Sequence, residues 1–366
     1  MKKKIVVLIL SFVYIVYLFF PSMGYANAEN QSNSAPGGFS FEVIQPENQR
    51  NKEVTYFDLL MQPGQKQTVQ MRMNNSSNKE IKVSIKLNSA KTNSNGVIEY
   101  GPNKIPKDKS VTYDFNEIVK APKEVEIPAG ESQLVGFELT MPKSEFNGFV
   151  SGGIQLQQVD DEGEKKETES GMVVNKFAYL VGMLLSESEL EGIKPDLKLN
   201  SVYPELQNFR NAVFINFSNT QPVYTEGMSV NVQINKKNSE EILYETKKNN
   251  MRMAPNSMID FPISMNGEEM KPGTYRANIL VTTTAGGKWA WKQEFKITKE
   301  DADKFNEQDL SLAQDRSIQW GIISVIIGIV LLLAIVIYLF IRRRQKNKAK
   351  KERLKRKMAK KKIKNR

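Results

Sequence analysis

Residues Trp320–Ile341 form an apolar run of 22 residues (WGIISVIIGIVLLLAIVIYLFI) that contains no charged side chain. As a helix, this run extends about 33 Å, which matches the roughly 30 Å hydrocarbon core of a bilayer. Trp320 and Tyr338 lie near its two ends, where amphipathic rings favour the membrane interface. The sequence therefore predicts one transmembrane helix at 320–341, with folded domains confined to the residues before it.

A strongly basic tail follows the apolar run directly. Residues 342–366 contain 16 Lys and Arg against one acid, so the tail carries +15 whereas the whole chain carries +11. Short Lys/Arg-rich flanks remain in the cytoplasm, so we predict a cytoplasmic tail at 342–366 and an extracellular body. The tail has no aromatic residue to stack on bases, so we expect contact with anionic membrane lipid and no nucleic acid. Binding of a cytoplasmic partner is the alternative.

The N-terminus has the layout of an export signal. Lys2–Lys4 precede an apolar run from Ile5 to Phe20, and Ala26-Asn27-Ala28 has the small-x-small pattern of a signal-peptidase site. Because the apolar run stops short of about 20 residues, we predict a cleaved signal peptide at 1–28. An uncleaved N-terminal anchor is the alternative.

The chain contains no cysteine and no histidine. Thiolate and imidazole nucleophiles, disulfides and zinc sites are therefore excluded, and only oxygen-ligand ions such as calcium remain. The acidic stretch 160–170 (DDEGEKKETES) lacks the D-x-D-x-D-G spacing of a calcium loop, so a solvated hairpin tip is preferred. We expect no catalytic residue, no metal site and no cofactor. A wall hydrolase with two carboxylates is the weakest hypothesis, since no carboxylate pair stands in an apolar setting.

Between the two ends, hydrophobic residues recur with a period of two after Pro-Gly turns. The alternating sets include Val69/Met71/Met73, Ile81/Val83/Ile85/Leu87, Val135/Phe137/Leu139/Met141, Val213/Ile215/Phe217, Val230/Val232/Ile234 and Tyr275/Ala277/Ile279/Val281. Such alternation predicts antiparallel strands with one buried face. Their number and spacing predict an all-β fold of two tandem immunoglobulin-like β-sandwich domains, and Gly273-Thr274-Tyr275 has the spacing of a tyrosine corner.

A break at Glu187–Pro195 (ESELEGIKP) separates the two β-rich halves. We expect an N-terminal sandwich at 38–160, a C-terminal sandwich at 165–303 and a linker at 304–319. The strand predicted at 172–185 follows the acidic loop as in a hairpin, so pairing back onto the first sandwich is the alternative for this strand.

Several short motifs resemble those of one family. FSFEVIQPENQ (39–49), TYFDLLMQPGQKQTV (55–69), IPAGES (127–132) and GFVSGGIQL (148–156) resemble the N-terminal domain of WxL-interacting proteins. PDLKLNSV (195–202), MAPNSMIDFPI (253–263) and GKWAWKQEF (287–295) resemble its second domain. The order of the motifs, together with the signal peptide, spanning helix and basic tail, makes the resemblance specific.

The resemblance implies a Gram-positive cell-surface protein that partners WxL-domain proteins. Its first domain is then expected to bind peptidoglycan, and its second to bind host extracellular proteins in adhesion. The tryptophan-containing segments of this chain have no W-x-L, so it is a candidate partner and not itself a WxL protein. The resulting hypothesis is a non-enzymatic, membrane-anchored binding scaffold. The alternative is a single-pass sensor that signals through its basic tail.

Two groups of residues are candidates for ligand contact. Tyr56 and Phe57 are adjacent, so on a strand they point to opposite faces and one of them is expected to be exposed. The preferred interpretation is that both rings pack in the core or cover its edge. Trp289 and Trp291 share one face of the last strand, where core packing is again more common than binding. The candidate binding residues are Asn48, Gln49, Tyr56, Phe57, Asp58, Trp289 and Trp291.

Overall fold

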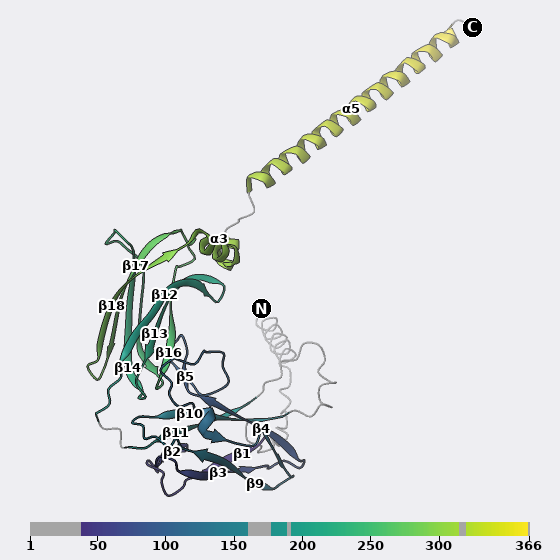
Figure 1. Ribbon diagram of the computed structural model, residues 1–366. Helices are drawn as coiled ribbons and strands as arrows, with labels where there is room; N and C mark the ends of the chain where they lie inside the picture. The colour runs from purple at the N-terminus through teal and green to yellow at the C-terminus, as the bar shows by residue number, and fades with distance from the viewer. Residues whose placement is uncertain (1–37, 160–176, 189–191, 315–319, 365–366) are drawn as a thin grey trace, which may run out of the picture.

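The computed structural model describes residues 38–159, 177–188, 192–314 and 320–364. In these ranges the chain forms two β-sandwiches, two short helices after the second sandwich, and a long C-terminal helix (Figure 1). The predicted signal peptide at 1–28 and the acidic loop at 160–170 lie outside the described residues.

The first sandwich consists of two sheets. One sheet has the order β1 (Ser40–Ile44), β3 (Lys66–Asn74), β9 (Ser132–Thr140) and β7 (Val119–Lys120). The other has the order β2 (Phe57–Leu60), β11 (Tyr179–Ser186), β10 (Val150–Gln158), β4 (Ile81–Ser89) and β8 (Glu124–Ile127). The alternating apolar residues of β3, β4 and β9 form its core, as the period-two pattern predicts.

The strand after the acidic loop, β11, belongs to the first sandwich. It pairs antiparallel with β10, from Val150 opposite Leu185 to Leu156 opposite Tyr179. Its other edge pairs in parallel with β2, which joins Met183–Ser186 to Phe57–Leu60. Of the two arrangements considered for this strand, the structure has the one in which it pairs back onto the first sandwich.

The second sandwich packs a three-stranded sheet on a four-stranded sheet. The first contains β12 (Leu197–Gln207), β13 (Arg210–Asn219) and β16 (Ser257–Ser264), and the second contains β15 (Ile242–Met253), β14 (Thr225–Lys236), β17 (Gly273–Thr283) and β18 (Lys288–Ile297). The Tyr275 hydroxyl donates a 2.8 Å hydrogen bond to the Lys271 carbonyl, which is the bond of a tyrosine corner. The predicted all-β fold with two immunoglobulin-like sandwiches is confirmed.

A helix that the sequence does not predict closes the second core. In α3 (Lys299–Gln308), Thr298 and Asp301 form a capping box, and Ala302 and Phe305 are buried in the core. Within the linker predicted at 304–319, α3 and α4 (Leu310–Gln314) occupy most of the described part. In the sequence, charged residues surround Ala302 and Phe305, so no apolar stripe indicates this helix.

A short β-ribbon that extends from the first sandwich contacts the second sandwich. The ribbon of β5 (Lys91–Thr92) and β6 (Ile98–Glu99) reaches β15 and β16 of the second sandwich. Thr92 Oγ1 lies 2.7 Å from Ser257 Oγ and accepts a hydrogen bond from Ala254 N at 3.0 Å. Further bonds join Arg252 N to Gly96 O (2.8 Å), Asn256 Nδ2 to Ser110 O (3.1 Å) and Phe149 N to Pro222 O (2.6 Å). These contacts hold the two sandwiches to each other.

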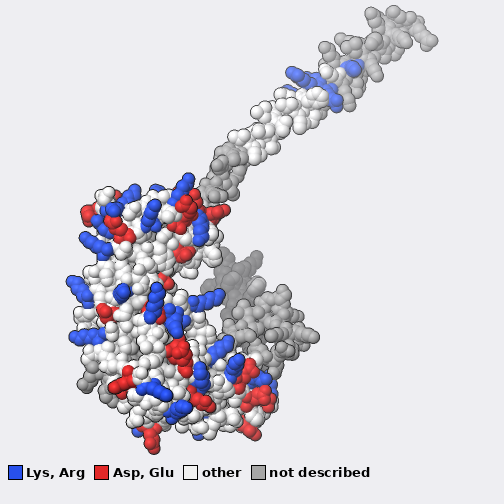
Figure 2. Space-filling model, in the orientation of Figure 1, with Lys and Arg blue, Asp and Glu red and all other residues white. Residues whose placement is uncertain are grey.

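The C-terminal helix, α5 (Trp320–Lys364), extends away from the second sandwich. Its segment Ser324–Arg344 is long and apolar enough to cross a membrane, and the large side chains of this segment are exposed. Figure 2 shows basic side chains directly after the white apolar rod, whereas acidic and basic side chains are intermixed over the visible face of both sandwiches. The charge asymmetry therefore resides in the tail and not in the folded domains.

Candidate ligand-binding groove

An open groove of ≈ 1080 Å³ lies at one end of the first sandwich. Its walls come from the loop between β1 and β2, from β2 itself, from the turn into β3, and from the residues just after β11. The lining residues, called the polar groove below, are Glu47, Asn48, Gln49, Arg50, Asn51, Asp58, Leu60, Met61, Gln62, Gln65, Glu187 and Ser188. This volume is slightly larger than the roughly 300–1,000 Å³ of typical ligand pockets, and the lining is dominated by amides and charges.

Asn48 and Gln49 shape the polar groove by holding its loop. The Asn48 amide donates to Leu60 O at 2.8 Å and exchanges two hydrogen bonds with the Gln67 amide at 2.9 and 3.0 Å. The Gln49 amide donates to the Asn51 and Tyr56 carbonyls, both at 2.9 Å, and accepts from Asp58 N at 3.2 Å. Because these bonds engage both amides, the two residues act mainly as a frame.

Arg50 brings a positive charge to the polar groove. Its guanidinium donates to Ser186 Oγ at 2.9 Å, lies 3.9 Å from Asp58 Oδ1, and sits 5.6 Å from the centre of the Phe149 ring. Its side chain is 22% exposed. A guanidinium has five N–H donors, so this fixed arginine retains donors for an anionic or carbonyl group of a ligand.

Glu187 brings a negative charge to the same groove. One oxygen, Oε2, accepts a 2.9 Å hydrogen bond from Phe146 N, whereas Oε1 is buried and has no hydrogen-bonding partner among the described residues. Burial raises the pKa of Glu187, and Glu145 raises it further against the lowering effect of the Phe146 N–H. A ligand N–H donor near the partly exposed carboxylate would favour its charged form and reverse part of this shift.

The two aromatic candidates of this region lie outside the groove lining. Phe57 is fully buried, in contact distance of the core ring of Phe137. Tyr56 is partly buried against the first core. Burial raises its pKa, and the nearby Asp58 and Tyr100 raise it further. The structure thus brings Asn48, Gln49 and Asp58 together in the polar groove and leaves both aromatic rings outside it.

Trp289 and Trp291 lie on β18, the edge strand of its sheet, and cover the second core there. Both pack against that core, with Trp291 5.9 Å from the Phe217 ring centre and Trp289 Nε1 3.3 Å from Asp196 Oδ1. The same sheet carries a shallow depression of ≈ 530 Å³ whose lining includes Asn231, Asn278 and Trp291. The tryptophans are therefore structural in the main, and their exposed portions remain candidates for contact.

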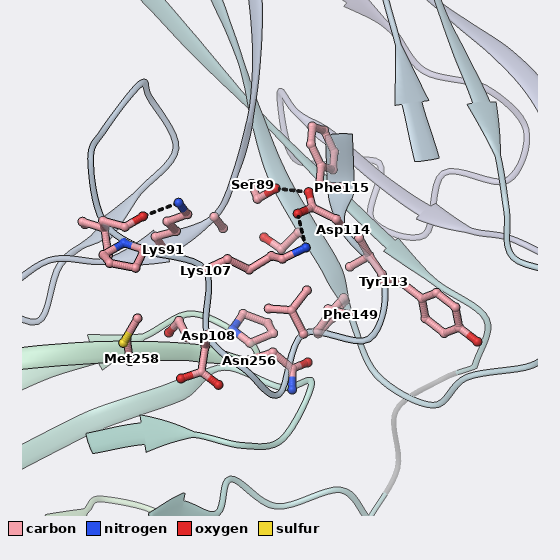
Figure 3. Close-up of a pocket in the computed structure, with 18 residues that line it drawn as sticks. Ser89, Lys91, Lys107, Asp108, Tyr113, Asp114, Phe115, Phe149, Asn256 and Met258 are labelled. Atoms are coloured by element: carbon pink, nitrogen blue, oxygen red, sulfur yellow. Dashed lines mark hydrogen bonds and ion pairs between the residues drawn. The ribbon is translucent and has the colours of Figure 1, made fainter. Parts of the chain in front are cut away.

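A second cavity, shown in Figure 3, lies between the two sandwiches and encloses only ≈ 40 Å³. Asp114 accepts hydrogen bonds from Ser89 Oγ at 2.6 Å and Asn116 N at 3.0 Å, and lies 3.3 Å from Lys107 Nζ. Burial alone would raise the pKa of Asp114, but these bonds lower it below its ordinary value. A few water molecules fit in this volume and a sugar does not, so the cavity belongs to the domain interface.

Reasoning from the sequence misses Arg50 and Glu187. Arg50 follows the Asn48-Gln49 pair directly, so it could have been included. Glu187 falls in the segment interpreted as a domain break, and its carboxylate reaches the groove only because β11 pairs beside β2. Within the described ranges, no three acidic side chains gather closely enough to hold a metal ion.

The chain has two immunoglobulin-like sandwiches joined by hydrogen bonds, an open polar groove in the first, and an exposed apolar helix after the second. These features are those of a two-domain binding protein. Residues 39–158 match the family model described as WxL Interacting Protein, peptidoglycan binding domain. Residues 168–307 match the model described as WxL Interacting Protein, host binding domain, a match that includes β11. The chain belongs to the WxL-interacting protein family, and the matched domains support a binding role.

A comparison with curated proteins gives no match. Similar solved structures include the E. coli chaperone DraB (12% identity, 71% of this chain, 98% of that chain, TM-score 0.26). Others are the Pseudomonas aeruginosa CupB2 chaperone (11%, 64%, 96%, 0.25) and a PapD-like domain of human CEP192 (13%, 47%, 100%, 0.26). These values are too low to support a functional comparison.

Proposed function

We propose that this protein is a non-enzymatic binding scaffold anchored in the cell membrane of a Gram-positive bacterium. In this proposal a signal peptide at 1–28 exports the body, the segment Ser324–Arg344 of α5 crosses the membrane once, and the basic tail that follows stays in the cytoplasm on anionic lipid. The first sandwich binds peptidoglycan, the second binds host extracellular proteins, and the body partners WxL-domain proteins.

The polar groove carries the assignment of peptidoglycan to the first sandwich. It lies within the residues that match a peptidoglycan-binding model, except for the Glu187 side that β11 supplies. Peptidoglycan combines N-acetylated sugars with short peptides, so it presents hydroxyls, amides and carboxylates. Arg50 suits a peptide carboxylate, and the negative charge of the partly exposed Glu187 suits an N–H or O–H donor.

Titration of residues 29–319 with soluble peptidoglycan fragments tests this site. We expect Arg50→Ala to weaken binding about tenfold or more, because a hydrogen bond to a charged group contributes about 1.5–3 kcal/mol. Arg72→Ala is the matched control, since Arg72 lies on β3 in an exposed ion pair with Glu42 outside the groove lining. Equal affinities of the Arg50 and Arg72 variants would refute the groove as the site.

The membrane topology has its own test. Since the chain lacks cysteine, a single cysteine at the exposed Ala285 or at Lys360 gives one labelling site on either side of the apolar segment Ser324–Arg344. In intact cells, a membrane-impermeant maleimide is expected to label the Ala285→Cys variant and to leave the Lys360→Cys variant unlabelled until the cells are opened. Labelling of the tail in intact cells would reverse the proposed orientation.

The partners are tested by pull-down of residues 29–319 with WxL-domain proteins and with host extracellular proteins. Retention of WxL-domain proteins by the fragment is the expected result, and failure to retain any would remove that part of the proposal.

Incubation with purified cell wall is expected to release no reducing sugar. Sugar release would instead indicate a hydrolase.

A further inference from the structure

The end of the second sandwich nearest α5 exposes two apolar side chains. Phe209, at the tip of the β12–β13 hairpin, is 65% exposed, and Leu310, the first residue of α4, is 60% exposed. Leu310 N donates a 3.0 Å hydrogen bond to Phe209 O, so the two residues are neighbours. Together they form what we call the apolar tip.

Phe209 is costly for the fold. Asn208 and Phe209 form the two-residue hairpin turn with φ of 50° and 60°. Glycine is the favoured residue at such a second position, and a non-glycine residue in this region costs about 1–2 kcal/mol. Since Phe209 is neither buried nor favourable for the turn, folding does not account for its presence.

The apolar tip is rigid. Asp309 is fully buried, and its Oδ2 accepts a 2.7 Å hydrogen bond from Asn211 N at the start of β13. Its Oδ1 accepts from Ser311 N at 2.7 Å and Leu312 N at 3.4 Å in α4. The hairpin and α4 are therefore clamped to each other, so Phe209 and Leu310 are held on one surface.

The position of the tip along the chain identifies what can cover it. The apolar helix begins at Trp320, ten residues beyond Leu310. Ten residues span about 15 Å as a helix and at most about 35 Å when extended. Any membrane that α5 crosses thus lies within this reach of the apolar tip, and aromatic and aliphatic side chains partition favourably into its interfacial layer.

We propose that Phe209 and Leu310 are a membrane-contact surface that inserts into the outer interfacial layer of the membrane crossed by α5. This inference rests on the proposed membrane anchoring. The contact fixes the second sandwich against the bilayer, and the interface around Thr92 then sets the orientation of the first sandwich as well. The occupant is the lipid surface itself and not a protein.

Spin labelling of the full chain in phosphatidylcholine/phosphatidylglycerol vesicles tests the proposal. Single-cysteine variants place a nitroxide beside Phe209 (Asn208→Cys), in the β17–β18 turn (Ala285→Cys) and in the middle of the apolar helix (Ile329→Cys). Accessibility to oxygen relative to a water-soluble nickel chelate reports contact with lipid. We expect a ratio several-fold higher at position 208 than at position 285, and highest at position 329.

The variant Phe209→Ser/Leu310→Ser, combined with Asn208→Cys, is expected to lower the ratio at 208 to that at 285 and to leave the ratio at 329 unchanged. Both side chains are exposed, so circular dichroism is expected to show the same fold. A ratio at 208 equal to that at 285 in the unsubstituted background, with 329 in lipid, overturns this inference and leaves the anchoring intact. A water-exposed label at 329 overturns both.

Discussion

Removing the Asp309 carboxylate is expected to destabilise the second sandwich strongly, although the residue lies after its last strand. In Asp309→Ala, the buried Asn211 N–H loses its acceptor, which costs about 1–3 kcal/mol. The first turn of α4 also loses its cap, which costs about 1 kcal/mol. The total of about 2–4 kcal/mol is a large part of the stability of a small domain.

Urea denaturation of residues 29–319 measures this effect. This fragment lacks Trp320, so its fluorescence comes from Trp289 and Trp291 and reports the second sandwich alone. With a slope of about 1.5 kcal/mol per molar urea, a loss of about 3 kcal/mol lowers the midpoint by about 2 M. Asp309→Asn retains one side-chain oxygen and is expected to give an intermediate shift.

The pH dependence checks the cause. Burial alone would raise the pKa of Asp309, but hydrogen bonds from Ser311, Asn211 and Leu312 lower it below its ordinary value. Its stabilising contribution is therefore complete above the unfolded pKa of about 3.9 and is lost as pH falls through the lower folded value. A midpoint shift that is negligible at neutral pH, or that stays constant into acid, would refute the clamp.

Three further results are expected. Tyr275→Phe removes the tyrosine-corner hydrogen bond and is expected to lower the stability of the second sandwich by about 1 kcal/mol in the same urea assay. An unchanged midpoint would mean that this hydrogen bond makes no net contribution to stability. Gly153→Ala places a Cβ 2.4 Å from Tyr100 O and is expected to cost about 1–3 kcal/mol in thermal unfolding, whereas Gly101→Ala, with its nearest contact at 3.5 Å, is the neutral control. Binding of peptidoglycan fragments is expected to weaken as pH falls from about 7 to about 4.5. The reason is that the pKa of Glu187 is raised, so its carboxylate takes up a proton at a higher pH than an ordinary glutamate does. Glu187→Gln should abolish that pH dependence, and an unchanged pH profile would exclude the carboxylate from the site.

The strands and the apolar helix that is long enough to cross a membrane follow from local patterns in the sequence. Val69, Met71 and Met73 are buried on one face of β3, as period-two alternation requires. The motifs in their order were likewise sufficient to indicate the family. The short helix α3 was not predictable from a hydrophobic stripe, because Ala302 and Phe305 are its only buried residues and charged residues surround them.

The polar groove, by contrast, depends on pairing between distant parts of the chain. Its frame residues Asn48 and Gln49 were identified from polar residues beside aromatic ones, although both turned out to be held by internal hydrogen bonds. Phe57 illustrates the opposite outcome, since the adjacent aromatic residues Tyr56 and Phe57 do not alternate with polar residues and so do not show which of them faces the core. Only the packed second sheet decides that its ring is buried.

Apolar spacing and charge asymmetry in this sequence determined two β-rich domains, one helix long enough to span a membrane, and a basic tail. The tertiary structure alone decided that β11 pairs with β2, which brings Arg50 within 2.9 Å of Ser186 across 136 residues of sequence and sets Glu187 beside it. Alternation specifies which side of a strand is buried, because burial acts on each residue locally. It carries no information about which strand becomes the neighbour, because that choice depends on the packing of the whole domain.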